Sequence, residues 1–365
     1  MVLRIVFIHL GKAKASHLWS NIANILETQE EIDIDVITSY KLDDVPIFNS
    51  RINYYVYNEK EEVTTILDSI SMDSNFRQGF WRYSLERLFA LTAHHDIYPN
   101  DSLLHIESDI LLLPNFPFDS FQSLTKPAWL KFDMIRDLAA ILYVPNIIKS
   151  KWLAERMIWE LQHSTEMNDM QLLNLISTKY PSEVTILPSS PNVTSSLFEG
   201  NDFLDENQKQ MVSSNFYNFD GIFDPAAIGI WLTGSDPRNN FGITRRFDTK
   251  RLLEGKTYIN PSKVSLEYST SNGLYISENA TKIRVFNLHI HSKNERFFDE
   301  GWEDEMSELV RLSRIGRIQR TYSIRIFLGL LISNYRNRTL FRFILWFPFL
   351  APVKKFLSAI KGFLK

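Results

Sequence analysis

The chain has 365 residues, of which 44% are apolar and 13% aromatic, so it can bury a full hydrophobic core and is not intrinsically disordered. It contains no cysteine, which excludes disulfides and thiolate metal sites. The formal net charge is −3, but after Glu308 the sequence has 12 basic residues and no acidic one, so a basic tail follows an acidic body.

The first hundred residues alternate strand and helix patterns. Buried-strand patterns cover residues 3–10, 32–38 and 52–57, and amphipathic helices are predicted over 16–26, 61–70 and 80–91. This order predicts a parallel or mixed sheet covered by helices.

Two acids then separate two short apolar runs. Glu107 and Asp109 lie between the runs 103–106 and 110–113. In an extended chain residues i and i+2 point to the same side, so we expect both carboxylates to face one spot. Hard oxygen ligands at a strand end suit Mg²⁺ or Mn²⁺. An ordinary strand end with two solvated acids is the alternative.

The second half of the predicted domain repeats the alternation less regularly. Strands are predicted over 137–144, 184–187 and 282–291, and helices over 147–163 and 169–178. Residues 195–260 are rich in Gly, Asn and Asp, which predicts loops with short helices.

Four stretches in this order resemble a GT-A-type glycosyltransferase, and in particular bacterial surface-polysaccharide enzymes of the capsule or lipopolysaccharide type. They are Glu107-Ser-Asp109, Asn168-Asp-Met-Gln-Leu-Leu-Asn174, the segment from Phe219 to Asn239, and Asn287-Leu-His-Ile-His-Ser-Lys293. The resemblance covers residues 1–300. It implies an α/β fold, with a Rossmann-like mixed sheet flanked by helices that binds a nucleotide-diphospho-sugar.

The resemblance implies a metal site for Mn²⁺ or Mg²⁺. Its ligands would be Asp109, Glu107 and at least one of two histidines, His289 and His291, of which we favour His291 because it adjoins the loop. The family commonly has Asp at the first acidic position, so Glu107 is a departure and Asp109 is the more secure direct ligand.

The resemblance also implies roles for residues that have ordinary structural explanations as well. Asp169 would contact the donor sugar or deprotonate the acceptor, although helix capping alone accounts for it. Nucleotide-sugar binding would fall to Gly11, Arg82, Glu107 and Lys293. Arg82 and Lys293 are otherwise explained as surface charges. Substrate recognition, or merely turn formation, would fall to a further group of residues: Asp220, Asp224, Asp236 and Arg238.

The tail beyond residue 315 combines lysines and arginines with Phe, Leu and Trp. No apolar run is long enough to span a bilayer, and Pro348 and Pro352 interrupt the longest. A basic amphipathic helix of this composition fits an anionic membrane surface. Packing on the body and nucleic-acid binding are the alternatives, and the apolar character argues against nucleic acid.

These observations predict a catalytic domain over 1–300, with a nucleotide-binding half (1–115) and a donor-sugar and acceptor half (116–300), followed by a membrane-associating tail over 301–365. The expected function is metal-dependent sugar transfer from a nucleotide-diphosphate donor, a UDP-sugar by the usual partnership of such motifs, to a glycan or lipid-linked acceptor. The expected location is the cytoplasmic face of a bacterial plasma membrane. A nucleotidyltransferase and a non-catalytic sugar-binding scaffold remain open alternatives, and spacing does not decide between retention and inversion.

Overall fold

The computed structural model describes residues 2–11, 16–28, 32–39, 49–72, 76, 79–164, 166–240, 242–278, 280–292, 294–299, 301–315 and 318–323. The chain forms two compact units. The larger consists of Met1–Gly234 and Arg246–Gln319, and the smaller of Ser235–Arg245 and Arg320–Lys365. Most of the predicted membrane-associating segment lies outside the described residues, so that expectation stays a prediction.

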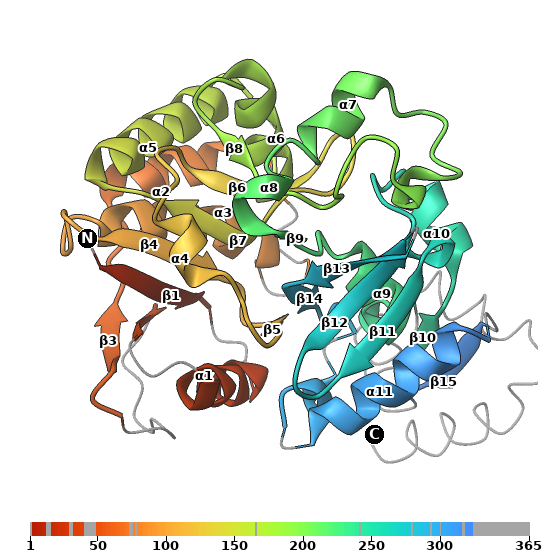
Figure 1. The fold of residues 1–365 in the computed structure, drawn as a ribbon. Coiled ribbons are helices and arrows are strands. Elements are labelled where there is room, and N and C mark those ends of the chain that lie inside the picture. Colours follow the sequence, from red (N-terminus) through yellow and green to blue (C-terminus); the bar gives the residue numbers. More distant parts are fainter. Residues whose placement is uncertain are drawn as a thin grey trace, which may run out of the picture. The chain divides into compact units, whose positions relative to one another are not determined.

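A seven-stranded mixed sheet forms the centre of the larger unit (Figure 1). The strand order is β3-β2-β1-β4-β7-β6-β8. Strands β3, β2, β1 and β4 run parallel, β7 runs antiparallel to β4 and β6, and β8 is parallel to β6. The bounds are β1 (Leu3–His9), β2 (Asp33–Thr38), β3 (Ile52–Val56), β4 (Ser102–Ile106), β6 (Ala128–Lys131), β7 (Asp137–Val144) and β8 (Thr185–Ile186). The predicted mixed α/β sheet is therefore present.

Helices cover both faces of this sheet, because alternate side chains of its strands point to opposite sides. Ile5 and Phe7 of β1 pack in one buried cluster with Ile22 of α1, whereas Val6 packs in the other with Leu88 of α3. Figure 1 shows α1 on one side of the sheet and the other four helices on the opposite side. These elements are α1 (Ser16–Thr28), α2 (Glu61–Ser69), α3 (Phe80–His94), α5 (Ile147–Gln162) and α6 (Asp169–Lys179).

Two smaller sheets complete the larger unit. A four-stranded sheet has the order β11-β12-β13-β9, and β5 pairs antiparallel with β14 in a separate ribbon. The bounds are β5 (Ile110–Leu112), β9 (Gly221–Ile222), β11 (Ser265–Ser269), β12 (Gly273–Glu278), β13 (Thr281–Val285) and β14 (Asn287–His289). The single strand predicted over 282–291 is thus two strands, which belong to different sheets.

The remaining helices are short apart from α11, as predicted for residues 195–260. They are α4 (Phe118–Phe121), α7 (Glu206–Met211), α8 (Phe216–Phe219), α9 (Ala227–Thr233), α10 (Thr249–Glu254) and α11 (Trp302–Ser313). Helix α11 buries Trp302, Met306 and Leu309 in the core of the larger unit. Strands β10 (Ile243–Arg246) and β15 (Gln319–Tyr322) pair with each other. No helix in the described part of the chain is both long and apolar enough to cross a membrane.

Candidate metal centre and its surroundings

Glu107 and Asp109 occupy a tight turn between β4 and β5. The backbone N–H of Ile110 donates to the carbonyl of Glu107 at 3.0 Å, which closes the turn. Strand β4 belongs to the central sheet, whereas β5 leaves it to pair with β14. The two carboxylates do converge as predicted, but the cause is this turn and not the alternation of an extended strand.

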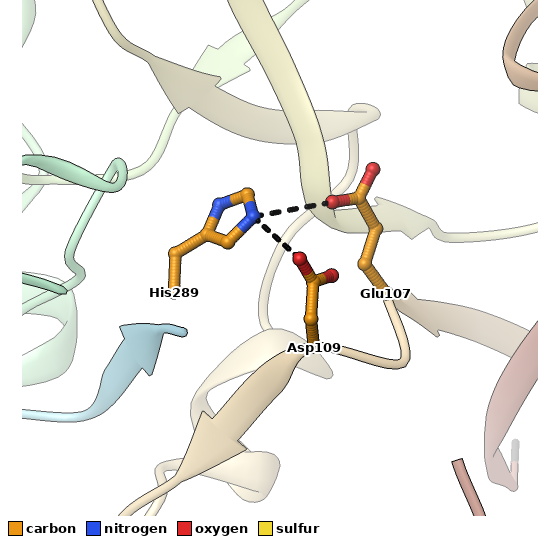
Figure 2. Close-up of side chains that lie close together, drawn as sticks. All are labelled: Glu107, Asp109 and His289. Atoms are coloured by element: carbon orange, nitrogen blue, oxygen red, sulfur yellow. Dashed lines mark hydrogen bonds and ion pairs between the residues drawn. The ribbon is translucent and has the colours of Figure 1, made fainter. Parts of the chain in front are cut away.

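The β5–β14 ribbon brings a histidine to the turn from 180 residues away. His289 stands opposite Ile110 in the ribbon, and the N–H of Ile290 donates to the carbonyl of Asp109 at 2.8 Å. The Nε2 atom of His289 lies 3.0 Å from Oδ2 of Asp109 and 3.9 Å from Oε2 of Glu107. Figure 2 shows the imidazole facing both carboxylates.

This arrangement fits a divalent cation. One ligand atom from each of Glu107, Asp109 and His289 lies within 4.8 Å of the others. Burial lowers the pKa of His289, which favours the neutral imidazole that binds metals. A set of two carboxylates and one imidazole suits Mn²⁺ and leaves coordination positions for oxygens of a ligand.

His291 does not join this cluster. Its backbone N–H donates to the carbonyl of His289 at 2.8 Å, so the chain turns immediately after β14 and the extended geometry that would align both rings is lost. The two ring centroids are 5.8 Å apart. The sequence favoured His291, but the structure places His289 at the carboxylates. Lys293 lies outside the described residues, so its predicted contact with a diphosphate stays a prediction.

Arg87 of α3 connects the turn to a third carboxylate. Its Nη2 atom lies 2.6 Å from Oε1 of Glu107 and 3.1 Å from Oδ2 of Asp169. Burial opposes its charge, but the two carboxylates outweigh this and raise the pKa of Arg87. Arg87 was not among the site residues predicted from the sequence. The sequence feature that could have identified it is a charged residue inside the buried stretch of α3, between Leu85 and Leu88.

Asp169 begins α6 as predicted, but it does not cap the helix. Asn168 is the capping residue: its side chain accepts from the backbone of Gln171, whose side chain in turn accepts from the backbone of Asn168. Asp169 is thereby free to point at Arg87. Burial raises the pKa of Asp169 while Arg87 lowers it, and the Oδ1 atom has no hydrogen-bond partner among the described residues.

The two residues expected near a nucleotide occupy different environments. Arg82 forms ion pairs with Glu59 and Asp68. Gly11 follows β1 with φ of +86°, a conformation that favours glycine, and donates to Ser39 Oγ at 3.0 Å. A Cβ at position 11 would come within 2.8 Å of the Tyr83 ring, so close packing also requires glycine there.

Asp220 and Asp224 differ sharply although they are four residues apart. Asp220 is exposed and ends α8 in the left-handed conformation, with φ of +55°. Asp224 is fully buried and accepts backbone N–H groups from Ile228 and Gly229 at 2.8 Å, and from His289 at 3.2 Å. Burial raises the pKa of Asp224 to about 6, and these N–H groups oppose the rise. Asp224 therefore positions the His289 backbone.

Asp236 and Arg238 belong to the smaller unit and bind each other. The guanidinium of Arg238 contacts both oxygens of Asp236 at 2.7 to 3.1 Å, and the backbone N–H of Arg238 donates to Oδ1 at 2.8 Å. These contacts are typical of a turn that the two side chains stabilise. Turn formation was the alternative role predicted for these residues.

Several glycosyltransferases of solved structure have partial likeness to this chain. The galactosyltransferase LgtC, solved with donor and acceptor sugar analogs, has 11% identity and a TM-score of 0.37, and the match covers 51% of this chain and 73% of LgtC. GlyE of Streptococcus pneumoniae TIGR4 has 12% identity, a TM-score of 0.34 and coverage of 55% and 49%. The bifunctional enzyme WbbM has 9% identity, a TM-score of 0.35 and coverage of 60% and 44%. Neither a family model nor a curated protein matches the sequence.

Proposed function

We propose that this protein is a glycosyltransferase that moves a sugar from a nucleoside-diphosphate donor, a UDP-sugar by our expectation, to a glycan or lipid-linked acceptor in bacterial surface-polysaccharide synthesis. The observation that carries the proposal is the cluster of Glu107, Asp109 and His289 at the end of β4, beside the buried pair of Arg87 and Asp169.

The three clustered side chains would hold Mn²⁺ or Mg²⁺. Such an ion would supply positive charge to neutralise the diphosphate as it leaves the sugar. The two oxygens of Glu107 have different neighbours, since one contacts Arg87 and the other faces His289. This geometry supports the assignment, because the second oxygen points to the place where the ion would bind. The buried, neutral imidazole and the fixed turn would hold the ligand atoms ready before any ion binds.

The neighbouring residues suit the reacting sugar. In the transfer, the bond between the anomeric carbon and a phosphate oxygen breaks and its electron pair leaves with the diphosphate. The acceptor oxygen forms the new bond, and its proton would pass to the Asp169 carboxylate or to an oxygen of the leaving diphosphate. Asp169 has a buried carboxylate oxygen without a partner in the described structure, and it would accept a hydrogen bond from a sugar hydroxyl. Arg87 would keep Asp169 and Glu107 in place.

Donor turnover in the presence of Mn²⁺ tests this proposal. Purified protein is incubated with a panel of sugar nucleotides, with and without chelator, and the release of nucleoside diphosphate is measured. We expect slow, metal-dependent release from one donor, reduced at least about a hundredfold by Asp109→Asn. Asp202→Asn, an exposed change in the same unit, should retain the rate.

Two other outcomes would contradict the proposal. Pyrophosphate release from a nucleoside triphosphate and a sugar phosphate would identify a nucleotidyltransferase. Sugar binding without turnover of any donor, even with membrane lipid extract as acceptor source, would identify a non-catalytic scaffold.

The proposal also assigns roles to the two halves of the catalytic domain and to the basic tail. Residues 1–115 would bind the nucleotide and residues 116–300 the donor sugar and the acceptor. The basic segment 315–365 would hold the protein on the inner face of the plasma membrane, where lipid-linked acceptors are found. Sedimentation with anionic vesicles, compared with neutral vesicles, tests this attachment.

A further inference from the structure

A cavity of about 500 Å³ lies in the larger unit, and none of the metal-cluster residues lines it. Its walls come from α9, the start of α10, the 3-10 turn Pro261–Lys263, the start of β11 and the end of α11. Its lining includes the aromatic residues Trp231 and Phe247 and the charged residues Lys263 and Arg314. Neither the sugar transfer proposed above nor the metal cluster uses any of these residues.

The lining is rich in hydrogen-bond donors and has no acid. It contains two cations, Lys263 and Arg314, together with four hydroxyl groups. Arg314 donates to the backbone carbonyl of Leu266 at 3.2 Å, which fixes its guanidinium at the wall. Lys263 lies 3.8 Å from Glu199, but side chains that are 45% and 57% exposed form only a weak pair. Arg314 also acts electrostatically on Glu267, so Glu267 offsets part of its charge. Lys263 keeps most of its capacity to bind an anion.

Trp231 adds a buried donor that lacks an acceptor. The residue is 5% exposed, and its Nε1 atom has no hydrogen-bond partner in the described part of the chain. Its ring packs edge-on against Phe247, with centroids 5.5 Å apart. A buried donor left unpaired costs about 1–3 kcal/mol, and an indole N–H can be satisfied only by an acceptor such as an oxygen.

We propose that this cavity is a second binding site, for a saccharide that carries a phosphate or carboxylate group. The cations would bind the anionic group, and the indole N–H would donate to a saccharide oxygen. The hydroxyls of Ser262 and Ser313 already donate to Asn260 and to the Val310 carbonyl, so they would accept hydrogen bonds from saccharide hydroxyls. The volume exceeds what a bare phosphate fills and falls in the range of cavities that hold small organic ligands. The proposal does not depend on the catalytic assignment, because the cavity shares no residue with the cluster.

Binding in the presence of EDTA tests the site, because chelation removes any contribution of a metal at Asp109. Glucose 1-phosphate, glucuronate and glucose are titrated by calorimetry and by intrinsic fluorescence. We expect at least one of the two anionic probes to bind about tenfold more tightly than glucose, with affinity that falls as salt rises. The order of the two anions identifies phosphate or carboxylate as the preferred group.

Matched variants separate this cavity from the rest of the surface. Lys263→Gln combined with Arg314→Gln should weaken binding of the anionic probe at least about tenfold, since each charged hydrogen bond contributes about 1.5 kcal/mol or more. The control pair Lys282→Gln and Arg311→Gln removes two exposed cations, and should change affinity less than about twofold. Trp231→Phe should weaken binding a few-fold and remove the fluorescence response.

Three results would overturn the proposal. Loss of binding in Asp109→Asn would place the probe at the metal cluster. Equal affinity for glucose and the anionic probes would show that the cations take no part. Absence of binding at millimolar probe, with the wild-type protein folded by circular dichroism, would show that solvent alone satisfies the indole.

Discussion

Three carboxylates lie close together at the end of β4, and one buried guanidinium separates two of them. Arg87 contacts Glu107 and Asp169, and its side chain is only 15% exposed. Like charges at this distance repel strongly in a poorly solvated site, so the arginine makes the cluster possible before any metal binds. This role differs from that of an exposed ion pair, which contributes little.

Replacing Arg87 should therefore destabilise the metal-free protein. We expect Arg87→Gln to lower the free energy of unfolding by about 3–5 kcal/mol, because it leaves buried carboxylates without their cation. Arg87→Lys keeps the charge and should cost less. Urea denaturation with EDTA measures both, and a loss under about 1 kcal/mol for Arg87→Gln would contradict this view.

Glu86, the preceding residue of α3, predicts a pH dependence. Burial, then the charge of Glu59, raise the pKa of Glu86 from 4.5 to about 7, and Arg82 partly opposes the rise. A raised folded-state pKa means that stability present below 4.5 is lost as pH rises through 7. Glu86→Gln mimics the protonated acid and should remove this part of the decline, a gain on the order of 2 kcal/mol at about pH 8. The test is to measure the free energy of unfolding as a function of pH for both proteins. Parallel curves for wild type and variant would contradict this prediction.

Among the individual site residues, some could be predicted from the sequence and others could not. The acid pair was identifiable by its spacing and chemistry, whereas a histidine near residue 290 was identifiable only through the family resemblance. The choice between His289 and His291 depended on a turn that alternation does not reveal. Arg87 was not predicted for a related reason: a helix pattern shows that an arginine is present, but not that it meets a carboxylate from α6. The predicted contact of Arg82 with a nucleotide stays a prediction.

At the scale of elements, the packing of α9 on β14 fixes the histidine. Asp224 accepts from two N–H groups at the start of α9 and from the N–H of His289. Gly229 allows the approach, because a Cβ there would lie 2.1 Å from the carbonyl oxygen of His289. The helix start and the strand end are thus joined through a single carboxylate.

Asp224→Asn should loosen this junction. An amide has one oxygen in place of two, so at least one buried N–H loses its acceptor, at a cost of about 1–3 kcal/mol. We expect weaker Mn²⁺ binding as His289 shifts, measured by calorimetry alongside urea unfolding. The matched control is Asp220→Asn, where the residue is exposed and asparagine tolerates the left-handed conformation. Equal effects of the two changes would refute the assignment.

Several elements were predictable because their patterns are long. Strand β7 spans 137–144 as predicted, and α6 begins at Asp169 as predicted. Strand β6 was missed, since four residues carry too little periodicity, and the β11–β12 hairpin was missed as well. The division of 282–291 into β13 and β14 depends on partners far along the chain, which a local pattern does not contain.

At the scale of the whole molecule, a metal that binds only the folded chain must stabilise it. Mn²⁺ at a hundredfold excess over its Kd should raise the free energy of unfolding by about 2.7 kcal/mol and raise Tm by several degrees. His289→Ala should abolish this gain, whereas Asp220→Asn should keep it. Differential scanning fluorimetry across a Mn²⁺ series measures the effect, and a wild-type Tm that does not respond to Mn²⁺ would count against the site.

The β5–β14 ribbon also determines the stage of protein synthesis at which the metal site can form. Its ligands are separated by 180 positions, so during synthesis the acidic turn emerges long before His289. A ribosome-bound chain that stops before residue 287 could form much of the central sheet but could not complete the cluster. Contacts of such long sequence separation form late and slowly in folding. Metal affinity would therefore report that a nascent chain has finished folding.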